Sequence, residues 1–299
     1  FARRRPDLLV LLGDRSEMLA PAVAALPWNI PLAHLYGGKV TEGAIDERVR
    51  HALTKMAHLH FVSCRTYADR VRQMGEEAWR VFDVGLAGLD RIHRHPRAER
   101  AALCAELGLD PGSPFLLATF HPVTLEPAAQ DGQVAAFLEA LEASGLAVVV
   151  TYPNADAGNA RIAAALEEFA RRRPERVRLL RHAGTRLYFD LLAQAAAMVG
   201  NSSSGVSEAP SFRLPVVNIG TRQDGAVKAA NVIDVGYGAG DILAGIRRAT
   251  SAAFREGLRD LRNPYGAGDA SRRIVAALRD IPLDDRLLRK KFVDLPGHG

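Results

Sequence analysis

Residues 199–222 have the sequence VGNSSSGVSEAPSFRLPVVNIGTR, in which two short apolar runs enclose a turn of three serines. The first run, residues 195–199, predicts a buried β-strand that ends at Gly200. The second run, residues 215–219, predicts the next strand. Buried strands that are joined through a polar turn and a short helix are typical of a parallel α/β sheet.

The serine turn offers several groups that can hold a phosphate. Ser202, Ser203 and Ser204 are typical of the N-cap and first turn of a helix, where backbone N–H groups and the positive end of the helix dipole face an anion. Glu208 follows about one turn later, and its carboxylate can accept hydrogen bonds from a ribose diol. Arg222 follows the second strand, at the end where open α/β sheets bind ligands. The alternative interpretation of this stretch alone is an ordinary strand–loop–helix connection with polar caps.

Strand and helix patterns alternate along the whole chain, which predicts doubly wound parallel sheets. Strands are predicted over residues 8–12, 30–35, 59–63, 80–84, 115–120, 146–151, 177–180, 195–199, 215–219 and 232–235. A polar stretch around Pro96 predicts a linker between two halves. We therefore predict an N-terminal Rossmann-like domain over 1–95, a nucleotide-binding Rossmann-like domain over 96–268, a closing helix over 269–281 and a frayed polar tail over 282–299.

Composition narrows the class of protein. Apolar residues make up 48% of the 299 residues and charged residues 24%, which is ordinary for a soluble globular chain without a membrane span. The formal charge is +5, but aromatic residues make up 6% and do not interleave with the basic runs, so we expect no nucleic-acid partner. Cys64 and Cys104 lack metal-ligand or redox spacing and are expected to be core thiols of a cytoplasmic protein.

Polar side chains follow several predicted strands, at the edge where a ligand site is expected. Asp14 and Arg15 follow the first strand, His121 follows a strand of the second half, and Asn154 follows the next one. Asp46 opens a predicted helix. Each has a structural alternative: a turn residue, a charge at a helix N-terminus, or a histidine bonded to backbone. If the two halves face each other, these loops line one cleft, and the shared polarity then favours a ligand site.

Several motifs, in order along the chain, resemble one enzyme family. They are Leu12-Gly13-Asp14-Arg15, Gly37-Gly38, residues 40–46, residues 50–55, His121-Pro122-Val123-Thr124, Pro153-Asn154-Ala155-Asp156, Gly200-Asn201-Ser202-Ser203, Gly220-Thr221-Arg222-Gln223 and Asn263-Pro264-Tyr265-Gly266. The set resembles the hydrolysing UDP-N-acetylglucosamine 2-epimerases of sialic-acid and capsule biosynthesis, which have the two-domain GT-B fold. The resemblance covers the chain to about residue 280.

The resemblance implies a reaction and a set of residues. The C2 proton of the sugar is removed, UDP leaves, and water adds to the resulting glycal to release N-acetylmannosamine. The implied catalytic residues are Asp14, Asp46 and His121, together with Lys39. The implied UDP-contacting residues are Arg15, Asn154, Ser202, Ser203, Gly205, Glu208 and Arg222, with the two serines on the diphosphate and Glu208 on the ribose. No metal or cofactor is implied, and a homodimer through the first domain is expected.

Two features depart from the family pattern. The family loop after the second strand usually ends in a catalytic Glu, whereas this loop is Tyr36-Gly37-Gly38-Lys39. A desolvated lysine can act as a base, and the alternative is that Lys39 forms ion pairs with Asp14 and Asp46. Family members also carry a segment before the point that matches Phe1, so the first domain is expected to be incomplete.

The alternatives left open concern substrate and activity. The same fold can act on a GDP-linked or diacetamido sugar nucleotide. Because Lys39 replaces the family Glu, the chain can instead be a catalytically impaired sugar-nucleotide binder. A GT-B glycosyltransferase fits the fold but accounts less well for Asp14, Asp46 and residues 40–55.

Overall fold

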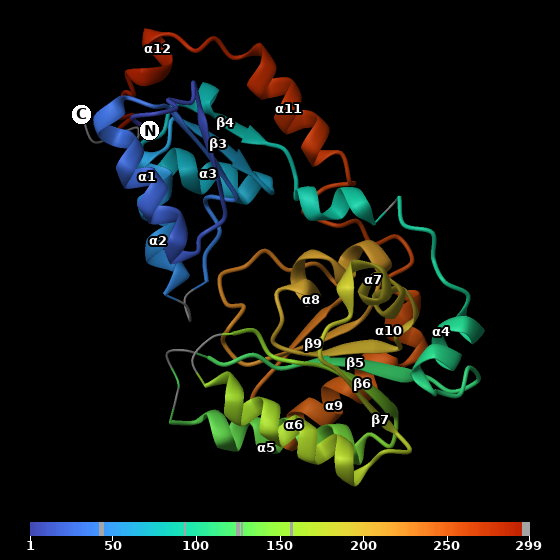
Figure 1. The fold of residues 1–299 in the computed structure, drawn as a ribbon. Helices are drawn as coiled ribbons and strands as arrows, with labels where there is room; N and C mark the ends of the chain where they lie inside the picture. Colours follow the sequence, from blue (N-terminus) through green and yellow to red (C-terminus); the bar gives the residue numbers. More distant parts are fainter. Residues whose placement is uncertain (42–44, 93, 124–125, 127, 156–157, 295–299) are drawn as a thin grey trace. The chain divides into compact units, whose positions relative to one another are not determined.

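The computed structural model describes residues 1–41, 45–92, 94–123, 126, 128–155 and 158–294 (Figure 1). The described residues form two compact units. Unit 1 contains those of Phe1–His93 together with those of Pro264–Gly299, and unit 2 contains those of Arg94–Asn263. The C-terminal part of the chain therefore returns to the unit that contains the N-terminus.

Unit 1 is built on a parallel sheet with the strand order β1-β2-β3-β4. Its strands are β1 (Leu9–Leu12), β2 (Leu32–Leu35), β3 (Leu59–Val62) and β4 (Val81–Asp83). Its helices are α1 (Leu19–Ala25), α2 (Asp46–Met56), α3 (Arg65–Gln73), α11 (Ala270–Asp280) and α12 (Asp285–Leu288). One core cluster joins Leu11 and Leu32 to Leu53 of α2, and another joins Phe61 to Ile274 of α11. Strands β2 and β3 are buried on both faces, including the side chains of His34 and His60.

Strand β1 is different because it lies at the edge of its sheet. Leu11 is buried under α1 and α2, but the side chains of Val10 and Leu12 are 46% and 58% exposed. The apolar run over 8–12 predicted this strand. In the structure the face of β1 that carries Leu11 is covered, and the face that carries Val10 and Leu12 is largely exposed.

Unit 2 contains a six-stranded parallel sheet with the order β10-β9-β8-β5-β6-β7. The strands are β5 (Phe115–Thr119), β6 (Ala147–Thr151), β7 (Val177–Leu180), β8 (Ala197–Gly200), β9 (Val216–Ile219) and β10 (Val232–Val235). The chain runs outward from β5 to β7, then returns to β8 beside β5 and runs outward to β10. The direction of winding therefore reverses between β5 and β8, and ligands of open α/β sheets bind at the carboxyl ends of strands at such a point.

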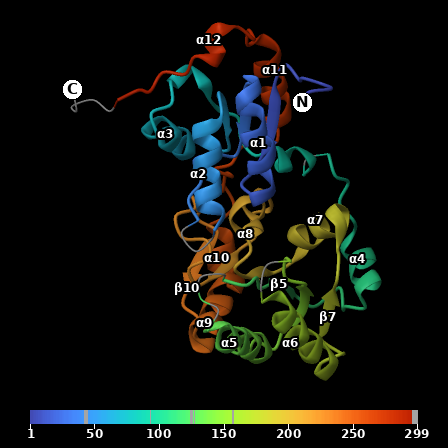
Figure 2. The ribbon, with the colours of Figure 1, turned by 60° about the vertical axis from the view of Figure 1, so that its left-hand side comes forward.

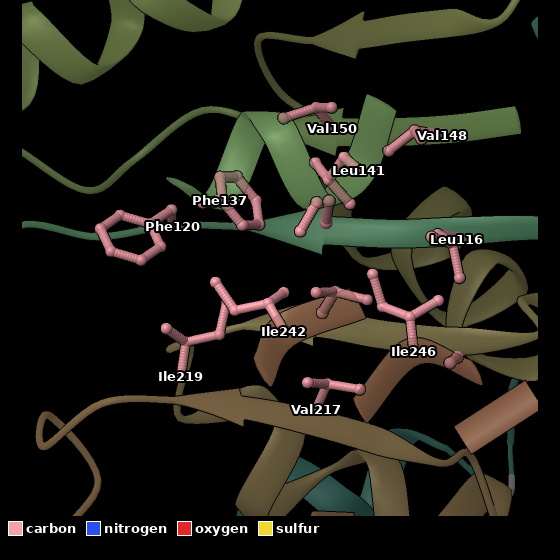
Figure 3. Close-up of a cluster of buried hydrophobic side chains, with 14 of the residues drawn as sticks. Leu116, Phe120, Phe137, Leu141, Val148, Val150, Val217, Ile219, Ile242 and Ile246 are labelled. Carbon is pink, nitrogen blue, oxygen red and sulfur yellow. The ribbon is translucent and has the colours of Figure 1, made fainter. Parts of the chain in front are cut away.

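Helices cover both faces of this sheet (Figures 1 and 2). They are α4 (Arg100–Leu107), α5 (Gln130–Ala143), α6 (Asn159–Arg172), α7 (Gly184–Gln194), α8 (Ser204–Ser207), α9 (Ala239–Thr250) and α10 (Ala252–Glu256). Helices α5, α6 and α9 lie on one face, with α7 and α8 on the other. Figure 3 shows Phe137 and Leu141 of α5 and Ile246 of α9 packed on β-strand side chains such as Val217. This core fixes the strand ends that carry the site.

The predicted tail contacts the rest of unit 1 through residues 286–290. The buried guanidinium of Arg80 donates to the carbonyl oxygens of Arg286 and Leu287, at 2.9 and 2.8 Å. Lys290 forms an ion pair with buried Glu76 at 2.8 Å. These contacts cross from residues 76–80 to the tail, and sequence patterns do not reveal such long-range pairing.

The structure shows the state of the two cysteines and the character of the helices. Cys64 and Cys104 are both buried and free, as expected of core thiols. Among the described helices, none is long and apolar enough to cross a membrane.

Candidate active site

The polar site of unit 1 is organised around Arg50. This side chain is 1% exposed. Its Nε donates to Oδ2 of Asp14 at 2.8 Å, and its Nη1 donates to Oε2 of Glu47 at 2.7 Å. The same guanidinium donates to the carbonyl oxygen of Lys39 and to Oγ1 of Thr41, both at 2.9 Å. One buried cation therefore joins the end of β1, the loop after β2 and the first turns of α2.

The predicted catalytic residues of unit 1 lie around this network. The ionic partner that the structure gives to the Asp14 carboxylate is Arg50. Lys39 contributes its backbone carbonyl to the network. Asp46 is the first residue of α2 and is partly exposed, whereas Arg15 is exposed beside Glu17. An ion pair of Lys39 with Asp14 and Asp46 stays a prediction.

Glu47 is held as a carboxylate by its neighbours. Burial alone would raise the pKa of Glu47, but the Thr41 amide, the His51 ring and the Arg50 guanidinium together lower it. The Thr41 amide donates to Oε2 at 2.7 Å, and Nε2 of His51 lies 2.8 Å from Oε1. Glu47 is thus an ionised second partner for Arg50 at neutral pH.

Beneath the Asp14 turn lies a neutral histidine. Nε2 of His34 is 2.8 Å from the carbonyl oxygen of Gly13, and burial lowers the pKa of His34 to about 4. The ring therefore donates to the Gly13 carbonyl without bringing a second positive charge to the network. Gly38 has φ +77, and a Cβ there would meet the Tyr67 carbonyl, so the loop after β2 requires glycine at this position.

Four neighbouring strands of unit 2 end in a hydrogen-bonded row. In the order of the sheet, these are β9, β8, β5 and β6. The Asn201 side chain, after β8, accepts from the backbone N–H of His121 at 2.7 Å and donates to its carbonyl oxygen at 2.8 Å. The backbone N–H of Asn154, after β6, donates to Nδ1 of His121 at 3.0 Å. His121 is thus held from both neighbouring strands.

The row continues to the loop after β9. Nη1 of Arg222 and Nε2 of Gln223 donate to the Asn201 carbonyl oxygen at 3.2 and 3.0 Å. Gly200 precedes Asn201 with φ +140, and a Cβ there would overlap the Thr119 carbonyl oxygen. Only glycine allows β8 to approach β5 closely enough for Asn201 to reach His121.

The serine turn differs in one respect from its prediction. Helix α8 begins at Ser204 and has four residues, so it supplies a much weaker dipole than a long helix. Oγ of Ser202 accepts from the Ser204 backbone N–H at 3.3 Å, and Ser203 is exposed. A Cβ at Gly205 would meet Val216 at 2.8 Å, so packing accounts for this glycine.

Glu208 follows α8 directly, and burial raises its pKa. The predicted ribose contact of Glu208 and the diphosphate contacts of Ser202 and Ser203 stay predictions. Glu208, the two serines and the row from Asn154 to Arg222 are polar groups near the point where the winding of the sheet reverses. This arrangement suits an anionic ligand held by backbone and side-chain donors.

A family model described as UDP-N-acetylglucosamine 2-epimerase matches residues 1–279. The chain belongs to this family. A Legionella pneumophila protein named UDP-N,N'-diacetylbacillosamine 2-epimerase (hydrolyzing) is 38% identical, over 97% of this chain and 75% of the relative. A Campylobacter jejuni protein named GDP/UDP-N,N'-diacetylbacillosamine 2-epimerase (hydrolyzing) is 36% identical, over 99% of this chain and 77% of the relative. The chain thus spans about three quarters of the length of these relatives.

Solved structures support the fold of this 2-epimerase family member. The crystal structure of UDP-GlcNAc 2-epimerase from Neisseria meningitidis bound to UDP-GlcNAc matches with a TM-score of 0.77 at 20% identity. The match covers 94% of this chain and 78% of that chain. Both the resemblance to the 2-epimerases and the predicted GT-B-like α/β class are confirmed.

Three residues of this epimerase-family site escaped the sequence analysis as individual candidates. Arg50 lies four residues after Asp46 and three after Glu47, so helical spacing places them on one face of α2. Asn201 and Gln223 lie inside motifs that were noted, but the pairing of an amide with a distant backbone leaves no sequence signal. Glu42 and Asp156, which belong to the same motifs, lie outside the described residues.

Proposed function

We propose that this chain is a hydrolysing 2-epimerase of a UDP-linked 2-acetamido sugar. UDP-N-acetylglucosamine is the first candidate substrate, with UDP and N-acetylmannosamine as products. The observation that carries the proposal is the row of Asn154, His121, Asn201 and Arg222 beside the serine turn. These groups lie at the strand ends where α/β sheets hold nucleotides.

The proposed roles of the residues follow the family resemblance. Asp14 and Asp46 exchange protons with C2 of the sugar. His121, Arg222 and the serine turn bind the diphosphate, and Glu208 binds the ribose. Loss of the C2 proton and cleavage of the C1–O bond yield UDP and a 2-acetamidoglycal. Water then supplies a proton to C2 and a hydroxyl to C1, which completes inversion at C2.

Positive charge near the leaving group accelerates such a reaction. Departure of UDP places additional negative charge on the diphosphate, and donors that are already oriented stabilise this charge without reorganisation. Arg222 is oriented by the Asn201 carbonyl and His121 by the Asn201 side chain. One buried asparagine therefore orients both groups proposed to contact the diphosphate, Arg222 through its backbone carbonyl and His121 through its side chain.

A diacetamido sugar nucleotide is the second candidate substrate. The relatives at 38% and 36% identity carry names that specify N,N'-diacetylbacillosamine, whereas a Neisseria meningitidis protein named UDP-N-acetylglucosamine 2-epimerase is 28% identical. The two substrates differ at C4 of the sugar, which carries a hydroxyl or an acetamido group, and at C6, which is a hydroxymethyl or a methyl group. Groups that contact C4 and C6 would decide between them.

The test is turnover of the UDP-linked sugars side by side, with the GDP-linked diacetamido sugar as a third arm. Released nucleoside diphosphate is measured by a coupled assay, and the free sugar is identified by NMR. We expect a free 2-epimer and one equivalent of nucleotide from one substrate. Calorimetry showing UDP binding without turnover of any of them would instead favour a silent sugar-nucleotide binder.

A further inference from the structure

The hydrogen bond at Nδ1 of His121 determines where the imidazole carries its proton. The donor is the backbone N–H of Asn154, 3.0 Å away. A backbone N–H can only donate, so Nδ1 must present a lone pair. The ring is therefore neutral and carries its proton on Nε2. The assignment follows from the identity of the donor and does not depend on a hydrogen position.

The backbone of His121 is fixed just as firmly as its ring. The Asn201 side chain is fully buried and pairs with both the N–H and the C=O of His121, at 2.7 and 2.8 Å. One of these backbone groups donates a hydrogen bond and the other accepts one. The pair therefore also fixes which end of the Asn201 side-chain amide is the oxygen. His121 thus meets the Asn154 amide in one position.

We propose that Asn201 and the Asn154 amide hold His121 as the neutral Nε2–H tautomer, which makes His121 a hydrogen-bond donor and not a base toward an anionic group. Asn201 is then a positioning residue. The identity of the anionic group as a nucleotide diphosphate rests on the proposed function, whereas the tautomer does not. Acting as a base at Nε2 would require Nδ1–H to face the Asn154 N–H, which sets two donors against each other.

The tautomer is measured directly by NMR on protein labelled with ¹⁵N-histidine. Long-range ¹H–¹⁵N correlations distinguish Nδ1–H, Nε2–H and doubly protonated rings, and the His121 signals are those lost in His121→Gln. We expect the Nε2–H pattern at neutral pH without any ligand. An Nδ1–H pattern, a doubly protonated ring or an equal mixture of tautomers would overturn the proposal.

The role of Asn201 is tested with two matched variants. Asn201→Asp keeps an acceptor for the His121 N–H but loses the donor to its C=O, so we expect a mixed tautomer population. Gln223→Ala removes a different hydrogen bond to Asn201 and leaves its pairing with His121 intact, so the Nε2–H pattern should persist. The signals of His95 and His182, also in unit 2, report whether each variant remains folded.

Ligand binding separates this proposal from the proposed function. UDP is titrated calorimetrically into wild type and both variants. We expect Asn201→Asp to weaken UDP binding at least tenfold. If wild type shows the Nε2–H tautomer but no turnover of any sugar nucleotide, the proposed function fails and the tautomer assignment stands. If Asn201→Asp leaves both the tautomer and UDP affinity unchanged, Asn201 is not a positioning residue.

Discussion

At the scale of single residues, the site of unit 1 depends on one buried guanidinium. Arg50 donates to the Asp14 and Glu47 carboxylates and to the Lys39 carbonyl. A planar guanidinium can satisfy several oxygens in fixed directions, whereas a lysine ammonium is a point charge on a flexible stem. The orientation of Asp14, the proposed acid–base group, therefore depends on Arg50.

Replacing Arg50 by lysine should lower turnover by about 10²-fold, within the range for a displaced acid–base group. The charge remains, but one ammonium cannot keep the hydrogen bonds to Asp14, Glu47 and Thr41. The measurement is kcat on the preferred sugar nucleotide. Arg48→Lys on the exposed side of α2 is the matched control. A kcat within threefold of wild type for Arg50→Lys would contradict this account of Asp14.

The family resemblance places Lys39 at a position where the family pattern has a catalytic carboxylate. Lys39→Glu should therefore raise turnover, because a positioned acid or base typically contributes ~10²–10⁴ in rate. Steady-state kcat is compared among wild type, Lys39→Glu and Lys39→Gln, the last of which removes charge without adding a carboxylate. A lower kcat in Lys39→Glu than in Lys39→Gln would show that this position does not transfer a proton.

Residues differ in how far sequence alone locates them. Asp14, His121 and Arg222 follow strands that could be predicted, so their place at strand ends could be predicted as well. Asn201 could be noted only as part of a motif, because its hydrogen bonds depend on the approach of β8 to β5 at Gly200. Hydrogen bonds between residues 80 positions apart follow from the sheet order, and local patterns do not contain that order.

At the scale of elements, α2 connects the site to the C-terminal tail. Its first turns carry Asp46, Glu47 and Arg50. Near its other end, Nζ of Lys290 donates to the Lys55 and Ala57 carbonyl oxygens, which lack partners within the helix. The tail thus supports the helix that carries Asp46, one of the two proposed acid–base residues.

Replacing Lys290 by alanine should destabilise unit 1 by about 1–3 kcal/mol, the range for leaving a buried partner short of a hydrogen bond. Burial alone would raise the pKa of Glu76, but hydrogen bonds from His60, Lys290 and Lys55 bring it to about 2. Thermal unfolding is followed by tryptophan fluorescence, because Trp28 and Trp79 both lie in unit 1.

Lys291→Ala is the matched control, since Lys291 is exposed and uses its backbone N–H to contact Glu77. Equal unfolding temperatures for the two variants would contradict a supporting role for Lys290.

Element boundaries were mostly predictable, with two informative exceptions. Strands β7 and β10 coincide with the predicted ranges 177–180 and 232–235. The helical segment after β10 is interrupted at Ser251, whose extended backbone ends α9 and whose hydroxyl caps α10. Helix α12 was missed because it is short and is held by the distant Arg80.

At the scale of the whole molecule, the two units should respond differently to acid. Burial lowers the pKa of His34 and His58, both in unit 1, to about 4. An unfolded histidine has a pKa of about 6.5, so between these values the unfolded chain binds more protons. The contribution to stability is therefore complete above about pH 6.5 and is lost as the pH falls toward about 4.

We accordingly expect the fluorescence-detected unfolding temperature of unit 1 to fall between pH 7 and pH 5. For the fully buried His34, complete loss of its contribution lowers the free energy of unfolding by roughly 3 kcal/mol. Below about pH 4.5, protonation of Glu76 in the unfolded chain lowers the free energy of unfolding further as the pH falls toward about 2. An unfolding temperature that stays constant from pH 7 to pH 5 would contradict the assignment of His34 and His58 as buried neutral groups.

The central claim is that this 2-epimerase family member removes the C2 proton and releases the nucleotide. The most direct test is to run the reaction in D2O on UDP-N-acetylglucosamine and its diacetamido counterpart, and to analyse the product by NMR. The account predicts a free 2-epimer with one deuterium at C2 and an equal amount of UDP. A product without deuterium at C2, or one that remains linked to UDP, would contradict it.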